Sequence, residues 1–316
     1  MINFDFKTYQ SLKNLKKYDA KINKINKILN DGGDMLDWYD INKCIPQDNI
    51  NRIKSISREI RNSCELFIVI GIGGSFMGAK AVIEALSDYF VAQKPEIIFA
   101  GNSLSEEYIK GLIDYMDNKD TVINVVSKSG NTLETKLVFN LLYSQMQKKY
   151  NQTELNNRIF ITTNSKDGYF KQLAEKERFV TFEIPEQIGG RFSVLTCVGL
   201  FPIAVAGINI DDILLGATNY PQKEAFEYAV IRDILYKRKK YVEVFSIYEP
   251  RLKYFTEWIK QLFGETQGKN KKGILPFSGF NTQDLHSLGQ FYQEGTSIVF
   301  ETIIDFDNKK NLDFTD

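Results

Sequence analysis

Apolar runs and helical periods alternate along the first 187 residues of the chain. Five short, almost continuously apolar runs are separated by segments whose apolar residues recur at helical spacing. These runs occupy residues 64–70, 96–101, 121–126, 158–163 and 178–185. Buried strands that alternate with helices are typical of a parallel sheet with helices on both faces. The pattern therefore predicts a doubly wound α/β domain, preceded by an amphipathic helix from Tyr9 to Leu29.

The pattern changes after Pro185, where "EQIGGRFSVLTCVGLFPIAVAGINI" predicts a glycine hinge that leads into an apolar helix. We place a domain boundary there, between residues 187 and 188. Beyond it, "YVEVFSIYE" and "TSIVFETIIDF" are typical of strands, with the aromatic helix "RLKYFTEWIKQLF" between them. Two strands are too few for a covered parallel sheet. We therefore expect residues 1–187 to form one α/β domain and residues 188–316 to form a second, incomplete one.

The composition narrows the class of partner. The 316 residues are 43% hydrophobic and 25% charged, which is typical of a soluble globular protein. Lys plus Arg and Asp plus Glu both number 40, so we expect no basic field for nucleic acid or an anionic membrane. No apolar run is long enough to span a bilayer. Three separated cysteines, Cys44, Cys64 and Cys197, fit a reducing cytoplasm. A small-molecule partner is the remaining expectation.

Two loops follow strands of the predicted first sheet, at the carboxyl edge where parallel sheets bind ligands. "GIGGS" ends in Gly74 and Ser75 and opens a helix, where free amides favour an anion. A tight turn with a serine cap is the alternative. "SKSGNT" offers the hydroxyls of Ser127, Ser129 and Thr132 together with converging amides, which suit a phosphate monoester. A turn with capping hydroxyls is again the alternative, but two such loops on one sheet favour a binding site.

Three further residues could supply chemistry. Arg191 follows two glycines and could stabilise an oxyanion, although an isolated arginine is more often part of a surface ion pair. Glu265 stands in "GETQGK", just after the predicted helix, and could be a general base or a solvated loop residue. His286 is the single histidine, and a lone histidine is usually structural. A carboxylate, an imidazole and a phosphate seat are nevertheless what proton transfer on a sugar phosphate requires.

The motifs "GIGGS", "SKSGNTLET", "GGRFSVLTCVGLFPIAVAGINI", "YEPRLKYFTEWIKQLFGETQGK" and "DLHSLGQFYQEG" occur in an order that resembles the phosphoglucose isomerase family in its shorter bacterial form. The resemblance implies two sugar isomerase (SIS) domains and interconversion of glucose 6-phosphate and fructose 6-phosphate without a cofactor or metal. It assigns catalysis to Glu265, His286 and Arg191. It assigns substrate binding to Gly74, Ser75, Ser127, Lys128, Ser129, Gly130, Asn131, Thr132 and Gln261.

The mechanism that this resemblance implies is proton transfer through a cis-enediolate. His286 would assist opening of the sugar ring, and Glu265 would move a proton from carbon 2 to carbon 1. Arg191 would stabilise the negative charge of the enediolate. The resemblance also implies a homodimer for the full-length form, in which the histidine reaches the site of the neighbouring copy.

One departure from the family pattern concerns the end of the chain. Family members continue further and supply a lysine near the carboxyl terminus, a motif that Lys309 and Lys310 do not match. We therefore expect a chain whose second domain is incomplete and whose activity is low. Two alternatives to a dedicated isomerase stay open, namely a non-catalytic sugar-phosphate-binding SIS module and an isomerase that also accepts mannose 6-phosphate.

Overall fold

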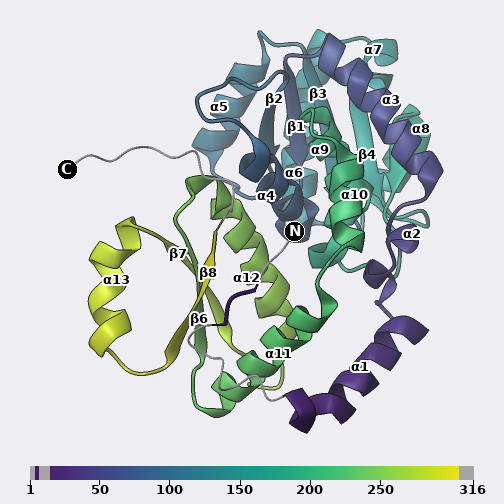
Figure 1. Cartoon of the computed structure of the whole chain (residues 1–316). Coiled ribbons are helices and arrows are strands. Elements are labelled where there is room, and N and C mark those ends of the chain that lie inside the picture. Colours follow the sequence, from purple (N-terminus) through teal and green to yellow (C-terminus); the bar gives the residue numbers. More distant parts are fainter. Residues whose placement is uncertain (1–3, 7–14, 306–316) are drawn as a thin grey trace.

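The computed structural model describes residues 4–6 and 15–305, and places them around two separate parallel sheets (Figure 1). Residues 9–14 of the predicted opening helix, together with Lys309 and Lys310, lie outside the described residues. The described remainder of that helix consists of a short 3₁₀ turn and a helix, η2 (Leu15–Tyr18) and α1 (Asp19–Asp31). None of the residues of α1 is buried.

The first sheet has five parallel strands in the order β2-β1-β3-β4-β5. The strands are β1 (Leu66–Ile70), β2 (Glu96–Ala100), β3 (Thr121–Ser127), β4 (Ile159–Thr163) and β5 (Val180–Glu183). All five lie within the runs predicted from the sequence or extend them by one residue. The crossover order is that of a doubly wound sheet, so the predicted α/β class is confirmed.

Helices cover both faces of this sheet, because successive residues of each strand point to opposite sides. On β1, between β2 and β3, Phe67 and Val69 enter one apolar cluster while Leu66, Ile68 and Ile70 enter the other. One face is covered by α3 (Gln47–Ser63), α4 (Met77–Leu86), α9 (Cys197–Val205) and α10 (Ile210–Thr218). The other is covered by α5 (Glu106–Met116), α6 (Leu133–Lys149), α7 (Gln152–Asn156) and α8 (Tyr169–Glu177).

The apolar helix α9 lies beyond the predicted domain boundary but packs on the first sheet. The Phe201 ring lies 4.6 Å from that of Phe182, 5.2 Å from that of Phe160 and 5.7 Å from that of Phe67, measured between centroids. This side chain thus contacts β5, β4 and β1 at once. The boundary between residues 187 and 188 stays a prediction. Helix α9 follows this boundary in sequence but belongs to the core of the first sheet.

The second sheet has three parallel strands among the described residues, in the order β7-β6-β8. They are β6 (Val242–Ile247), β7 (Leu275–Phe280) and β8 (Val299–Ile304). The sequence pattern missed β7, because Pro276 and Gly279 interrupt its apolar run. A Cβ at Gly279 would lie only 2.9 Å from Cγ1 of Val244, so the glycine lets two neighbouring strands approach.

Two helices cover one face of the second sheet, and the opposite face is largely open. Helices α11 (Gln222–Lys237) and α12 (Lys253–Gln267) contact the side chains that share a face with Glu243 and Phe245. On the opposite face Leu275, Phe277 and Ile303 are 62%, 41% and 58% exposed. Helix α13 (Gln283–Glu294) has no buried residue and projects away from the sheet (Figure 1).

The remaining short elements connect these layers. They are η3 (Asp37–Tyr39), α2 (Ile41–Cys44), η4 (Gly73–Ser75), η5 (Gly190–Leu195) and η6 (Pro250–Leu252). Among the residues that the structure describes, no helix combines the length and the apolar character needed to cross a bilayer.

A buried ion pair fixes α11 on the second sheet. Nε of Arg232 donates to a carboxylate oxygen of Glu243 at 2.6 Å, and both side chains are almost fully buried. Glu243 also accepts from the hydroxyls of Tyr228 and Thr302, the latter at 2.8 Å. The Arg232 guanidinium lies 4.1 Å from the centroid of the Phe263 ring on α12. The pair therefore links both helices to β6 and β8.

Arg232→Met should lower the free energy of unfolding by about 3–5 kcal/mol, because the Glu243 carboxylate stays buried without its cation. Replacing both partners, as Arg232→Met with Glu243→Leu, should recover much of the loss. The matched control is Lys171→Gln, which breaks a partly exposed pair with Glu175 on the surface and should cost less than about 1 kcal/mol. Urea denaturation measures all three, and equal losses for Arg232→Met and Lys171→Gln would contradict this account.

Candidate active site

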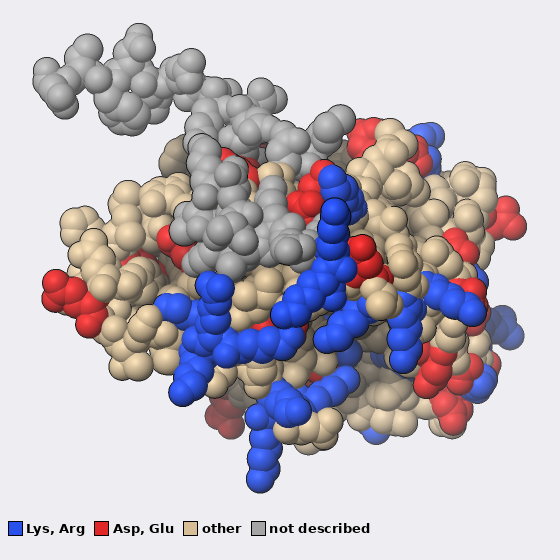
Figure 2. Space-filling model, turned by 60° about the horizontal axis from the view of Figure 1, so that its bottom comes forward, with Lys and Arg blue, Asp and Glu red and all other residues tan. Residues whose placement is uncertain are grey.

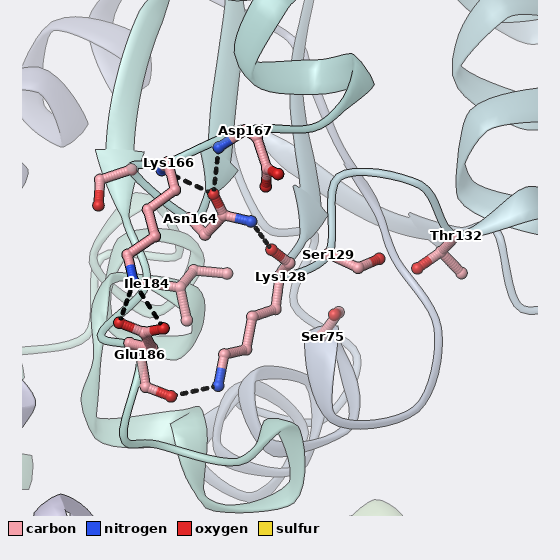
Figure 3. Close-up of a pocket in the computed structure, with 10 residues that line it drawn as sticks. Ser75, Lys128, Ser129, Thr132, Asn164, Lys166, Asp167, Ile184 and Glu186 are labelled. Carbon is pink, nitrogen blue, oxygen red and sulfur yellow. Dashed lines mark hydrogen bonds and ion pairs between the residues drawn. The ribbon is translucent and has the colours of Figure 1, made fainter.

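A cavity of about 500 Å³ opens at the carboxyl edge of the first sheet (Figure 3). Strands β1, β3, β4 and β5 each end at this edge, and the residues that follow them line the cavity. The lining consists of Ser75, Lys128, Ser129, Thr132, Asn164, Ser165, Lys166, Asp167, Ile184 and Glu186. The position agrees with the rule that open α/β sheets bind ligands outside the carboxyl ends of their strands.

The loop between β3 and α6 presents two of its three predicted hydroxyls to the cavity. Ser129 and Thr132 line it, whereas Ser127 is buried and its Oγ lies 3.1 Å from Oγ1 of Thr132. The backbone amide of Asn131 donates to Oγ of Ser129 at 3.2 Å, and Gly130 has a positive φ of 69°. The loop opens a helix of 17 residues, whose first amides favour an anion. Ser127 therefore supports the loop, and Ser129 and Thr132 face the cavity.

Lys128 connects this loop to the chain after β5. Its Nζ donates to the carbonyl oxygens of Glu186 at 2.6 Å and Ile188 at 2.9 Å. Burial lowers the pKa of the Lys128 ammonium, with the Glu186 carboxylate opposing that shift. Asn164, directly after β4, donates from Nδ2 to the Lys128 carbonyl at 2.7 Å. The cavity wall is thus a set of three loops joined by hydrogen bonds, as Figure 3 shows.

A second cluster joins Arg191 to α12. Nη1 of Arg191 donates to Oε1 of Glu265 at 3.0 Å, and its Nε donates to Oγ1 of Thr266 at 2.8 Å. Nε2 of Gln261 donates to the other carboxylate oxygen, Oε2, at 3.2 Å. Nε1 of Trp258 donates to the Arg191 carbonyl at 3.2 Å. Both the backbone and the guanidinium of Arg191 are therefore held by one face of α12.

Glu265 lies in the last turn of α12 and not after the helix, so that part of the sequence-based placement was wrong. The helix continues through Gly264, which faces Pro276 of β7, and ends at Gln267, with Gly268 as its cap. A carboxylate near a helix carboxyl terminus faces the negative end of the helix dipole. The Arg191 guanidinium offsets this repulsion. The Glu265 side chain remains about half exposed, which leaves room for a ligand to reach it.

Close backbone contact brings the first loop to this cluster. A Cβ at Gly74 would lie 2.2 Å from the carbonyl carbon and oxygen of Gly190, so no other residue fits there. Gly73, with φ of 57°, leaves space for the Gln261 amide, whose Nε2 would be 3.0 Å from a Cβ at that position. Ser75, at the end of the same loop, lines the cavity. The structure thus brings together residues of three predicted motifs, namely Gly74, Ser75, Arg191, Gln261 and Glu265.

His286 is separate from this cluster within one copy of the chain. It lies on the exposed helix α13, next to the second sheet, as predicted near the start of a helix. In the described part of the chain, no hydrogen bond or ion pair joins it to Arg191, Glu265 or the loop at 127–132. Figure 1 shows α13 on the side of the second sheet that faces away from the first. Its assigned role stays a prediction.

Several site residues were not identified from the sequence. Thr266 and Trp258 hold Arg191, and Asn164, Lys166 and Glu186 line the cavity. Asn164 directly follows the run "RIFITT", so the carboxyl-edge rule could have found it. No sequence pattern pointed to Thr266 and Trp258, because their roles depend on how α12 packs against the segment that carries Arg191. Among residues 4–6 and 15–305, no three His, Cys, Asp or Glu side chains form a group that could hold a metal ion.

Solved structures share this architecture. A hypothetical protein from Thermus thermophilus has a TM-score of 0.79 at 26% identity, covering 93% of this chain and 72% of that one. A glucose-6-phosphate isomerase from Chlamydia trachomatis has a TM-score of 0.74 at 20% identity, covering 96% of this chain and 66% of that one. At 20% identity the second likeness supports the fold, an α/β arrangement of the SIS type.

Curated relatives are closer in sequence. A glucose-6-phosphate isomerase from Staphylococcus saprophyticus is 45% identical over 300 residues, which cover 92% of this chain and 68% of that protein. Its counterpart from Alkaliphilus metalliredigens is 44% identical over 293 residues, covering 88% of this chain and 65% of that protein. The chain thus spans about two thirds of the length of the curated relatives that it matches.

A family model described as phosphoglucose isomerase matches residues 22–311, which include both sheets, the cavity and the Arg191 cluster. The relatives at 44–45% identity match a similar length of the chain. The chain therefore belongs to the phosphoglucose isomerase family.

Proposed function

We propose that the protein interconverts glucose 6-phosphate and fructose 6-phosphate by proton transfer, with no cofactor. The observation that carries this proposal is the Arg191–Glu265 pair, in which a carboxylate and a guanidinium 3.0 Å apart are held by α12. A non-catalytic sugar-phosphate-binding module would need the phosphate seat but would not need this pair. The names of the curated relatives support the same substrate class.

The phosphate group would bind at the start of α6. The hydroxyls of Ser129 and Thr132 line the cavity there, and Thr132 is the N-cap residue of α6, whose first-turn amides are available to an anion. Ser75 reaches the same cavity from the neighbouring strand. A phosphate bound far from the reacting carbons orients the sugar, which lowers the barrier without taking part in the chemistry.

The Arg191 cluster would carry the proton transfer. Substrate entry separates the guanidinium from the carboxylate, so that Glu265 faces the sugar carbons and Arg191 faces the sugar oxygens. Glu265 takes the proton from carbon 2, and the electron pair of that C–H bond forms the carbon 1–carbon 2 double bond of the cis-enediolate while the carbonyl electrons move to the oxygen on carbon 1. A proton passes from the oxygen on carbon 2 to the oxygen on carbon 1, and the same carboxylate returns its proton to carbon 1 to give the ketose. Arg191 exchanges its bond to Glu265 for one to the enediolate oxygen and stabilises its charge.

His286 would open the sugar ring, and the position of α13 on the side of the second sheet away from the first suits action on a second copy. We therefore propose a homodimer in which His286 of one protomer reaches the site of its partner. A cytoplasmic location is part of the same proposal, because Cys44, Cys64 and Cys197 are free and buried, as in a reducing compartment.

Glu265→Gln should reduce isomerisation by at least about 100-fold, because the amide keeps the shape of the side chain but cannot accept the proton. Deuterium incorporation into fructose 6-phosphate in D₂O, followed by proton NMR, detects even slow turnover. Calorimetric titration should show nearly unchanged binding. Exchange at the unaltered rate would remove Glu265 as the base, and absence of exchange in the unaltered protein would overturn the proposed function.

Thr266→Ala should lower kcat about tenfold and leave KM nearly unchanged, because a hydrogen bond to a charged group contributes about 1.5–3 kcal/mol to holding Arg191. Thr266→Ser keeps the hydroxyl and should restore most of kcat. The same exchange measurement checks both variants. A Thr266→Ser chain as slow as Thr266→Ala would show that the methyl group, and not the hydrogen bond, is what matters.

Ser129→Ala combined with Thr132→Ala should weaken binding of fructose 6-phosphate about tenfold or more and leave binding of unphosphorylated fructose unchanged, since each lost bond to phosphate is worth about 1.5–3 kcal/mol. The control is Ser144→Ala, which alters a serine of the same helix that bonds the Asn140 carbonyl outside the cavity. Equal losses for the two sugars, measured by calorimetry, would contradict a phosphate seat here.

A further inference from the structure

The neutral total charge conceals a strongly basic surface at the amino edge of the second sheet. Figure 2, which brings the bottom of Figure 1 forward, shows Lys and Arg side chains gathered across one face. Ten cations come from three segments near this edge, and we call them the basic edge. They are Lys16, Lys17, Lys21, Lys237, Arg238, Lys239, Lys240, Lys269, Lys271 and Lys272.

The parallel sheet brings two of these segments together. Strands β6 and β7 pair with Val242 opposite Leu275, so the loops "KRKK" and "KNKK" that precede them lie at the same edge. The Leu275 amide donates to the Tyr241 carbonyl at 2.8 Å and joins the two loops directly. The third loop at this edge, before β8, carries no charge between residues 295 and 298.

A ring contact adds the third segment. The Lys237 ammonium lies 5.4 Å from the centroid of the Tyr18 ring, and that of Lys21 lies 5.8 Å from the same ring. Segment η2 therefore lies beside the end of α11, and its lysines extend the basic edge. Lysine ammonium groups over an aromatic face are held in place without losing their charge.

Few carboxylates balance these ten cations. The three segments and the last turn of α11 contain Asp19 and Asp233. Asp233 pairs with Lys237, and this is the one ion pair of the basic edge within the described residues. Nζ of Lys240 donates to Oγ of Ser297 at 2.7 Å, which leaves its charge uncompensated. The expectation of no nucleic-acid partner was based on the net charge of the whole chain. A net charge of zero does not show that the positive charges gather on one part of the surface.

Tyrosines are interleaved with the cations. Tyr236 and Tyr241 flank the "KRKK" loop, and their rings meet edge to face at 5.4 Å. Tyr241 is 42% exposed, so part of its side chain is accessible to another planar group. Neither the "KRKK" loop nor the "KNKK" loop contains an aliphatic side chain that could enter a bilayer. The third segment continues into α1, which exposes Ile25 and Ile28, so an anionic membrane is the rival ligand.

We propose that the basic edge binds single-stranded nucleic acid. Its cations match the repeated phosphates of the backbone, and Tyr241 offers a stacking surface for a base. Because the basic edge would contact phosphates and stack on a base without reading base edges, its affinity should fall with salt concentration and vary little with nucleotide sequence. This activity uses none of the cavity residues and is independent of the proposed isomerase function.

The test is fluorescence anisotropy with a labelled single-stranded RNA of about 20 nucleotides, and with DNA of the same sequence, between about 50 and 200 mM KCl. The plot of log K against log salt should fall with a slope of about −0.7 for each phosphate contacted. Similar slopes are expected for RNA and DNA. If one of them binds more tightly, that nucleic acid is the ligand that the surface prefers. No binding at the low salt concentration would overturn the proposal.

A four-residue variant tests the location. Changing Arg238, Lys239, Lys271 and Lys272 to Gln should weaken binding at low salt by at least about tenfold and make the salt slope shallower by about 2–3. The control changes to Gln a second set that is exposed on the first unit and carries the same charge, namely Lys94, Lys110, Lys148 and Lys176. Equal effects of the two sets would show attraction by net charge alone and overturn a specific surface.

Stacking and the rival ligand need separate measurements. Tyr241→Ala should weaken binding about tenfold, and Tyr241→Phe should leave it unchanged, because the ring is what stacks. Circular dichroism confirms that each variant is folded.

Vesicles containing phosphatidylserine serve as the competing polyanion, and tight binding to vesicles with none to RNA would overturn the proposal. Glu265→Gln should bind RNA as the unaltered chain does.

Discussion

The position of the whole site depends on how closely η5 can approach its neighbours. A Cβ at Gly74 would meet the Gly190 carbonyl at 2.2 Å, one at Gly78 would lie 2.8 Å from Cβ of Val194, and one at Gly199 would meet the Val194 carbonyl at 2.1 Å. Three glycines from η4, α4 and α9 therefore create the space that η5 occupies. Since Arg191 is the second residue of η5, its backbone is fixed by contacts that no side chain could replace.

Helix α12 uses this fixed point to connect the two units. Trp258 bonds the Arg191 backbone, Thr266 and Glu265 bond its guanidinium, and the opposite side of the helix packs on the second sheet through the Phe263 and Phe245 rings, 5.7 Å apart. The Arg232–Glu243 pair then ties the second sheet to α11. These two ion pairs differ in their surroundings. The Arg232–Glu243 pair is buried and structural, whereas Glu265 of the Arg191–Glu265 pair is half exposed and open to a ligand.

Features that depend on local sequence patterns could be predicted from the sequence. The five apolar runs of the first sheet, and the loops after β1 and β3 that line the cavity, follow from periodicity and from the carboxyl-edge rule. Strand β7 was missed because Pro276 and Gly279 interrupt its pattern for reasons of packing. The roles of Thr266 and Trp258 depend on contacts between residues 67 and 75 positions apart in sequence. Likewise, a count of charges could not show that ten cations share one edge.

Storage and purification of the protein will be affected most by the open face of the second sheet. Leu275, Phe277 and Ile303 present apolar surface to water, and in the described residues β7 and β8 have one unpaired edge each. Copies that meet there bury this surface, so turbidity should grow with protein concentration and with sulfate, which strengthens apolar association. A mild detergent acts in the opposite direction by covering the same side chains. The choice of buffer is therefore decided by a face of the second sheet that lies apart from the cavity at the first sheet.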